Sequence, residues 1–213
     1  MRLHTGKLQK TKYAVALAIA LVGAVIGAPA AQADRGFASA DDCPVVQLEQ
    51  PFLPWNDLDY YALVPNGDLE DDASGWSLAG ASVVAGNESF YVHGTSDSRS
   101  LSIPSGAEAT SDMMCVGVEE RTLRLFVRSS NPSRASKLKV EVVFQDGKGS
   151  VRSERLGAVQ ADTATSWTPH VPMEIGISSD PRLDGKTPAR FRFTAQGPGD
   201  WQIDDVYVDP RYH

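Results

Sequence analysis

Two acidic segments, Leu63-Val-Pro-Asn-Gly-Asp-Leu-Glu70 and Trp201-Gln-Ile-Asp-Asp-Val-Tyr-Val-Asp-Pro210, lie at opposite ends of a strand-rich stretch of the chain. The dipeptide Gly75-Trp76 follows the first segment closely. If the first and last strands lie side by side, Glu70 and the Asp204-Asp205 pair meet at one edge of the fold. Such carboxylates either bind a hard cation or accumulate unfavourable like charge.

Between these segments, apolar and polar residues alternate as they do in half-buried strands. The expected strands are residues 82–84, 90–92, 101–103, 123–128, 138–144, 151–159, 190–194 and 203–208. Turn residues at 146–149 and 197–200 predict hairpins. No segment keeps a 3.6-residue period, so we predict an all-β sandwich of two antiparallel sheets.

The first 33 residues have the features of a secretory signal peptide. A basic start and an apolar run at residues 13–28 precede the small-x-small pattern Ala31-Gln32-Ala33. The run is short for a membrane span, and a retained N-terminal anchor is the alternative. We expect a secreted protein in which residues 1–33 are removed, residues 34–57 form an irregular arm and residues 58–213 form the sandwich domain.

The arm contains features that would fix it to the domain. Prolines interrupt regular structure there, and the apolar side chains of Phe52, Leu53 and Trp55 are expected to dock on the sandwich. The two cysteines, Cys43 and Cys115, are expected to form a disulfide in an oxidising compartment.

The charge of the chain excludes several partners. Without residues 1–33, 16 basic residues stand against 27 acidic ones, a net charge near −11. This acidity argues against nucleic acid and anionic lipid, and it suits neutral ligands or cations; simple solubility is the alternative explanation. We expect a monomer that does not insert in a membrane after cleavage.

Four short motifs resemble those of carbohydrate-binding modules with the galactose-binding-like jelly-roll fold. They are Asn66-Gly-Asp-Leu-Glu70, Gly75-Trp76, Thr165-Ser-Trp167 and Trp201-Gln-Ile-Asp-Asp-Val206. The chain also resembles an uncharacterised family of secreted actinobacterial proteins with similar ends. The resemblance implies a jelly-roll sandwich and a carbohydrate ligand.

The resemblance also implies a structural calcium ion. Its ligands would be Glu70 and Asp204, with Asp205 in reserve and Asp68 in the adjoining loop. Alternation places Asp204 on the same face as Val206 and Val208, which we expect to point inward. The alternative is that Glu70 and Asp204 only accept backbone hydrogen bonds.

Sugar sites combine aromatic faces with a few polar side chains. The candidates for such a site are Tyr61, Asn87, Tyr91 and His93, with Tyr60 and Trp201 as further aromatics. Trp76 and Trp167 are expected in the core instead.

No catalytic motif is present, so we expect no enzymatic activity and name no catalytic residue. The sequence contains no G-x-S-x-G, H-E-x-x-H or phosphate-binding glycine motif. Two functions remain in competition, a secreted non-catalytic module that binds cell-wall or extracellular polysaccharide and an envelope module for structural or protein contacts. A small hydrolase is the third alternative.

Overall fold

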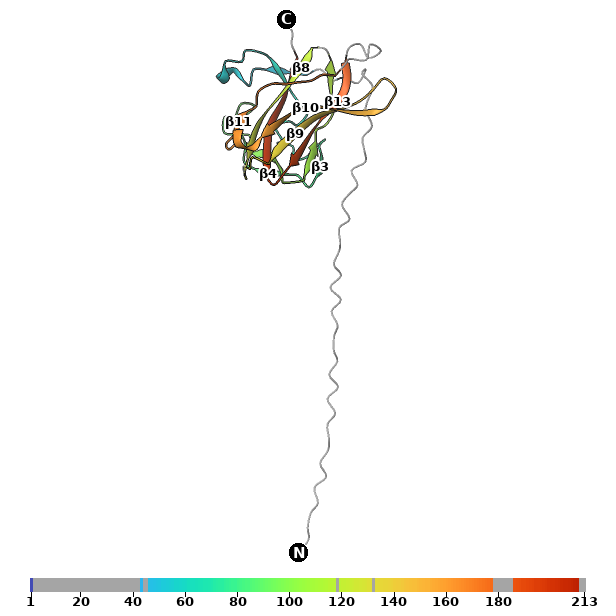
Figure 1. Ribbon diagram of the computed structural model, residues 1–213. Coiled ribbons are helices and arrows are strands. Elements are labelled where there is room, and N and C mark those ends of the chain that lie inside the picture. The colour runs from blue at the N-terminus through green and yellow to red at the C-terminus, as the bar shows by residue number, and fades with distance from the viewer. Residues whose placement is uncertain (2–42, 44–45, 118, 132, 178–185, 211–213) are drawn as a thin grey trace. The chain divides into compact units, whose positions relative to one another are not determined.

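Alternating sequence forms long strands in the computed structural model, which describes residues 1, 43, 46–117, 119–131, 133–177 and 186–210. The elements are β1 (Leu48–Glu49), η2 (Leu53–Trp55), β2 (Tyr61–Leu63), β3 (Ser77–Ala79), β4 (Ser82–Ala85), β5 (Arg99–Ile103), β6 (Glu108–Thr110), β7 (Met114–Gly117), β8 (Glu120–Ser129), β9 (Lys137–Gln145), β10 (Val151–Gln160), η3 (Ala161–Thr163), β11 (Thr168–Pro169), β12 (Met173–Glu174), β13 (Lys186–Gln196) and β14 (Trp201–Pro210). Figure 1 shows their arrangement. The described part of the chain contains no α-helix.

The described strands form two antiparallel sheets, as the sequence predicts. In sheet A, the last strand β14 pairs with β8 along one side and with β5 and β2 along the other. Strand β1 extends β2, β4 extends β5, and β11 and β12 pair with β8. In sheet B, the order is β10-β9-β13, followed by β6 and β3, with β7 also paired to β13. The fold is an all-β jelly-roll sandwich.

The hydrophobic core lies between the two sheets. Alternate residues of β8, Leu123, Leu125 and Val127, are fully buried there against Phe191 and Phe193 of β13. Successive side chains of a strand point to opposite faces of its sheet, so every second residue points into the core.

The opposite face of sheet A carries a second, aromatic cluster. Tyr61, Phe126 and Tyr207 come from β2, β8 and β14, and Trp167 joins them from the segment before β11. The arm residue Phe52 completes the cluster and is stacked on Phe126 with ring centroids 5.5 Å apart. Its burial confirms that the arm docks on the sandwich.

The other arm residues differ in exposure. Trp55 is half-buried against the ring of Phe126. The prediction for Leu53 is wrong, because the 3-10 turn of η2 leaves this side chain 50% exposed. The predicted disulfide between Cys43 and Cys115 is confirmed and ties the arm to β7. The predicted signal peptide lies outside the described residues, apart from Met1.

Two turn predictions have different outcomes. The turn after Gln145 joins β9 and β10 as a hairpin, which confirms the first. Residues 197–200 instead connect β13 of sheet B to β14 of sheet A, so the second hairpin is wrong. A turn between strands of different sheets has the same glycine-rich composition as a hairpin turn.

The expected strand at residues 90–92 is also wrong. Tyr91 has a left-handed backbone with φ of 54°, and the segment forms part of a loop between β4 and β5. The core prediction for two tryptophans is confirmed, since Trp76 is 2% and Trp167 9% exposed. Within the described residues, no helix is both long and apolar enough to cross a membrane.

Candidate functional site

A bulge in β14 creates the acidic centre of the candidate site. The register of β14 against β8 shifts between Asp204 and Tyr207. Asp205 occupies the left-handed region with φ of 47°. Asp204 lies opposite Phe126, whose side chain belongs to the aromatic cluster and not to the main core. The predicted phase of Asp204 is therefore wrong, because the bulge interrupts the alternation with Val206.

The close approach of Gly67 stabilises this bulge. The amide of Val206 donates to the carbonyl of Gly67 at 3.1 Å, and the amide of Val64 donates to the carbonyl of Val206 at 2.9 Å. A Cβ atom on Gly67 would lie 2.8 Å from the Val206 carbonyl oxygen. The glycine of the Asn66-Gly-Asp motif therefore permits the contact between the two acidic segments.

Asp204 is fully buried and is held by backbone donors. Its Oδ2 accepts a hydrogen bond of 2.8 Å from the amide of Glu88, and its Oδ1 accepts one of 3.0 Å from the amide of Asp205. Burial, followed by the charge of Asp205, raises the pKa of Asp204 far above its usual range.

Asp205 is only 1% exposed, and neither of its carboxylate oxygens has a hydrogen-bond partner. Burial raises its pKa first, and the negative charges of Glu88, Asp97, Asp68 and Glu49 raise it further. A buried carboxylate without partners is costly unless it is protonated or binds a cation. Asp205, the reserve calcium ligand of the sequence analysis, is therefore the carboxylate of this centre that lacks hydrogen-bond donors.

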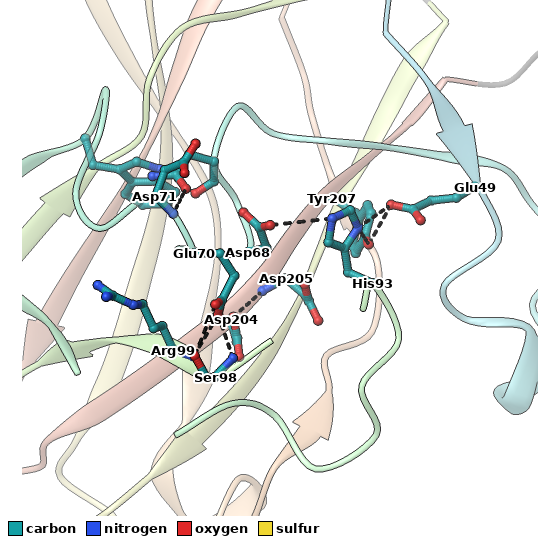
Figure 2. Close-up of polar contacts among 12 residues, drawn as sticks. Glu49, Asp68, Glu70, Asp71, His93, Ser98, Arg99, Asp204, Asp205 and Tyr207 are labelled. Atoms are coloured by element: carbon teal, nitrogen blue, oxygen red, sulfur yellow. Dashed lines mark hydrogen bonds and ion pairs between the residues drawn. The ribbon is translucent and has the colours of Figure 1, made fainter. Parts of the chain in front are cut away.

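Asp68 and Glu70 of the first acidic segment lie near Asp204 and Asp205 of β14 (Figure 2). Oε1 of Glu70 accepts hydrogen bonds from the amides of Ser98 and Arg99 at 2.7 and 2.8 Å. Glu70 and Asp204 thus both accept backbone hydrogen bonds, the role that the sequence leaves open as the alternative to calcium.

Asp68 is part of a series of polar side-chain contacts that ends at Glu49 of β1. Its Oδ2 lies 3.5 Å from Nε2 of His93, and Nδ1 of the same imidazole lies 3.1 Å from Oε1 of Glu49. The hydroxyl of Tyr207 donates to Oε1 of Glu49 at 2.8 Å. Figure 2 shows His93 between the two carboxylates. His93, a predicted sugar contact, is therefore part of the rim of the acidic centre.

The residues present partly fit a calcium ion. Asp205 supplies two unpaired oxygens, and Oδ2 of Asp97 is also buried without a partner. Carboxylate oxygens are the ligands that calcium prefers. Across the residues that the structure describes, however, no three acidic, histidine or cysteine side chains stand in a ready-made metal geometry. Ion binding would need the surrounding carboxylates to turn toward Asp205.

Glu88 holds the neighbouring loop, and sequence reasoning missed it. Its side chain is fully buried, and its carboxylate accepts hydrogen bonds from the amides of Phe90 and Val92, the latter at 2.9 Å. Its own amide binds Asp204. A single glutamate in a polar stretch has no pattern that would indicate such a role.

The loop presents aromatic side chains to solvent. Phe90 is 45% and Tyr91 49% exposed. Phe90 meets the half-buried Trp55 edge-to-face, with ring centroids 4.9 Å apart. We call Trp55, Phe90 and Tyr91 the aromatic surface; two of these three residues are absent from the sequence candidates.

The remaining sugar candidates have different environments. Asn87 belongs to the same loop, where its side-chain Nδ2 donates to the carbonyl of Glu88 at 3.1 Å. Tyr61 and Trp201 are 1% and 0% exposed, so their rings are not available to stack on a ligand. For Tyr61, the reason is the arm, because Phe52 covers its ring. Tyr60 is 54% exposed.

An open pocket of about 480 Å³ lies beside the arm. It is lined by Asn56, Asp57, Leu58, Asp59, Tyr61, Thr122, Pro172 and Asp209. The buried Arg124 forms an ion pair with Asp57 of this lining, and its Nε donates to the carbonyl of His170 at 3.0 Å. Burial lowers the pKa of His170. No cationic side chain lines this pocket, which disfavours an anionic occupant.

No family model matches the chain, and no curated protein matches its sequence. The resemblance to secreted actinobacterial proteins therefore stays a prediction. The solved structures that it resembles are mostly carbohydrate-binding modules.

Three of these structures illustrate the range of the likeness. The CBM22-1 and GH10 modules of a xylanase 10B from Clostridium thermocellum, complexed with xylohexaose, are 14% identical with a TM-score of 0.41, over 66% of this chain and 27% of that one. TmCBM61 with β-1,4-galactotriose is 15% identical with a TM-score of 0.40, over 70% of this chain and 98% of the module. A family 16 carbohydrate-binding module is 16% identical with a TM-score of 0.40, over 68% and 98%. The chain thus spans about a quarter of the xylanase and nearly all of each isolated module.

Proposed function

We propose that the protein is a secreted, non-catalytic module that binds polysaccharide through the aromatic surface of Trp55, Phe90 and Tyr91. The observation that carries this proposal is that Phe90 and Tyr91 remain about half exposed although their loop is firmly held. Aromatic rings present a large apolar face at little entropic cost, which suits the C–H face of a sugar.

The aromatic surface is fixed before any ligand arrives. The buried carboxylate of Glu88 accepts the amides of Phe90 and Val92, and the ring of Phe90 packs on Phe126 with centroids 5.7 Å apart. A site that is already ordered loses less conformational entropy on binding. Asn87 and the partly exposed His93 are polar residues of the same loop, and we propose that they contact sugar hydroxyls.

Affinity electrophoresis in gels that contain neutral polysaccharides (xylan, galactan or β-glucan) tests this function. We expect at least one polymer to retard the wild type and the variants Phe90→Ala and Tyr91→Ala to lose about tenfold in affinity, since burying an aromatic side chain contributes roughly 1.5–3 kcal/mol. Tyr60→Ala is the matched control, because Tyr60 is similarly exposed outside the aromatic surface. If no polymer retards the wild type, the proposal fails and the envelope protein-contact function becomes the better one.

We also propose a structural calcium ion at the acidic centre, with Asp205 as its principal ligand and Asp97 and Asp68 beside it. The unpaired, buried oxygens of Asp205 and Asp97 support this proposal. A bound divalent cation would supply the positive charge that this centre lacks, keeping the carboxylates ionised.

Thermal unfolding with added calcium or EDTA tests the ion. Ligand binding to the native state alone adds about 2.7 kcal/mol at a hundredfold excess over the dissociation constant. We therefore expect calcium to raise the melting temperature of the wild type and to leave Asp205→Asn unaffected. Asp162→Asn, at an exposed site, should respond like the wild type. Equal melting of the wild type in calcium and in EDTA would refute the ion.

A further inference from the structure

The outer face of sheet B is basic, in contrast to the rest of the protein. On β9 and β13, the residues that alternate with the buried core positions point away from the core. We call the following cationic side chains the basic face: Lys137 and Lys139 on β9, Arg190 and Arg192 on β13, and Arg155 on β10.

Strand register shows that these residues share one surface. Glu141 of β9 is the direct cross-strand partner of both Arg155 and Arg192. Lys139 and Lys137 lie opposite Thr194 and Gln196 of β13. Direct cross-strand partners have their side chains on the same face of a sheet. The basic residues therefore extend across three neighbouring strands.

Two carboxylates of the described residues form ion pairs with the basic face. Nζ of Lys139 lies 2.9 Å from Oε2 of Glu141, and Nε of Arg192 lies 3.4 Å from Oε1 of Glu108. Lys139 and Arg192 are thus each paired with one carboxylate. The described part of the chain offers no ion-pair partner to Lys137 or Arg155.

This local excess of positive charge is unusual in a chain whose net charge is −7 with the signal peptide and more negative without it. A surface of one sign on a protein of the other sign concentrates counter-ions of the matching charge. The basic face is therefore suited to an anionic partner.

The face also lacks aromatic side chains. The phenylalanines of β9 and β13, Phe144, Phe191 and Phe193, all belong to the buried core. Stacking, on which both neutral sugars and unpaired nucleic acid bases depend, is therefore not available there. Recognition on this surface must depend on charge and on hydrogen bonds to the cationic groups.

We propose that the basic face binds an anionic polysaccharide, one that carries carboxylate or sulfate groups. Guanidinium groups match the two oxygens of such groups with paired hydrogen bonds. Lys139 and Arg192 are 26% and 31% exposed, so their stems pack on the sheet while part of each side chain reaches solvent. A thin single chain fits a flat sheet face, whereas a membrane or a nucleic acid duplex would also meet the acidic remainder of the molecule.

This surface is separate from the one in the proposed function. The aromatic surface lies over sheet A and would take the apolar face of a sugar, while the basic face belongs to sheet B and selects by charge. Each can exist without the other, and variants of one leave the other intact.

Binding of the intact secreted protein to polygalacturonate, measured by calorimetry, tests this proposal. Fully methyl-esterified polygalacturonate is the matched neutral polymer. We expect tight binding to the acidic polymer only, with an affinity that falls by about tenfold or more between 50 and 300 mM NaCl because exposed charges are screened over about 8 Å near physiological salt. Equal binding of the acidic and esterified polymers would overturn the proposal.

Variants locate the binding on this face. The double variant Arg190→Gln/Arg192→Gln should lose about tenfold or more in affinity for polygalacturonate, since each of the two substitutions removes a charge-assisted contact. The control Arg134→Gln/Lys148→Gln changes the net charge equally at exposed positions off the face. Should the first pair impair folding, Lys137→Gln/Arg155→Gln tests the same face without altering an ion pair. Phe90→Ala should leave this binding unchanged. Unaltered affinity in both face variants, or equally tight binding to DNA or anionic vesicles, would reject an anionic polysaccharide as the partner.

Discussion

The amide of Glu88 donates a 2.8 Å hydrogen bond to the carboxylate of Asp204, joining the loop of the aromatic surface to the last strand. The side chain of Glu88 then accepts the amides of Phe90 and Val92. One buried residue thus links the acidic centre to Phe90 and Tyr91. A disturbance of either part is expected to reach the other.

Glu88→Ala should destabilise the protein and disorder the aromatic surface. The substitution leaves the amides of Phe90 and Val92 without their acceptor, at a cost of about 1–3 kcal/mol for a buried unsatisfied group. Urea unfolding measures the loss, and polysaccharide affinity should fall in parallel. Glu154→Ala, on the exposed part of β10, should change stability by less than about 0.5 kcal/mol. Unchanged stability of Glu88→Ala would show that the loop is held by its aromatic contacts alone.

Phe52→Ala should be among the most destabilising single substitutions in the arm. The ring is fully buried between Tyr61, Phe126 and Tyr207, and the Arg124 guanidinium lies 3.8 Å from its centroid. Removing a buried phenylalanine costs about 3–5 kcal/mol.

The neighbouring residue provides the control for this experiment. Leu53 is 50% exposed, so Leu53→Ala should change the free energy of unfolding by about 0.5 kcal/mol or less. Chemical unfolding monitored by tryptophan fluorescence distinguishes the two variants. Equal effects would mean that the arm is only a tether and does not contribute to the aromatic cluster.

Sequence reasoning predicted the long strands because their alternation is local. Strands β8, β9, β13 and β14 each keep a period of two over most of their length. The same reasoning failed at residues 90–92, where Phe90 and Val92 alternate with Tyr91 as in a strand. There, the amides of Phe90 and Val92 donate to the buried carboxylate of Glu88 and not to the carbonyl groups of a neighbouring strand.

The site was harder to predict because tertiary contacts decide it. The two acidic segments lie in contact, since the amide of Val206 donates to the carbonyl of Gly67, but the motifs could not show the bulge that accompanies the burial of Asp205. The bulge depends on the contact of Val206 with Gly67, more than one hundred residues away in sequence. Likewise, the alternation of β2 places Tyr61 on the outer face of sheet A, yet only the fold shows that Phe52 covers it.

The Cys43–Cys115 disulfide should stabilise the protein substantially. It closes a loop with a sequence separation of 72 residues, for which the chain-entropy model gives about 4 kcal/mol. Cys43→Ser/Cys115→Ser should therefore unfold at a lower urea concentration than the wild type. The intact mass of the non-reduced protein gives an independent check, because two free thiols would exclude the bond.

The hairpin turn at Asp146 should show a specific acid sensitivity. Its Oδ1 accepts hydrogen bonds of 2.9 Å from the amides of both Lys148 and Ser150, and its Oδ2 accepts one of 2.8 Å from Nε of Arg152. The pKa of Asp146 is lowered to about 2, foremost by the amide of Ser150 and then by Arg152 and the amide of Lys148. These bonds favour the ionised form, so protonation weakens the turn.

The sign of the effect follows from this lowered pKa. A carboxylate with a lower pKa in the folded state contributes stability above its unfolded pKa, near 3.8, and loses it as the pH falls toward 2. The stability difference between the wild type and Asp146→Asn should therefore be largest above pH 4 and shrink between pH 4 and 2. Urea unfolding across this range measures the difference, and a carbon-detected NMR titration of the Asp146 carboxyl group gives the pKa directly. A titration midpoint near 3.8 would mean that the three hydrogen bonds do not hold this turn in solution.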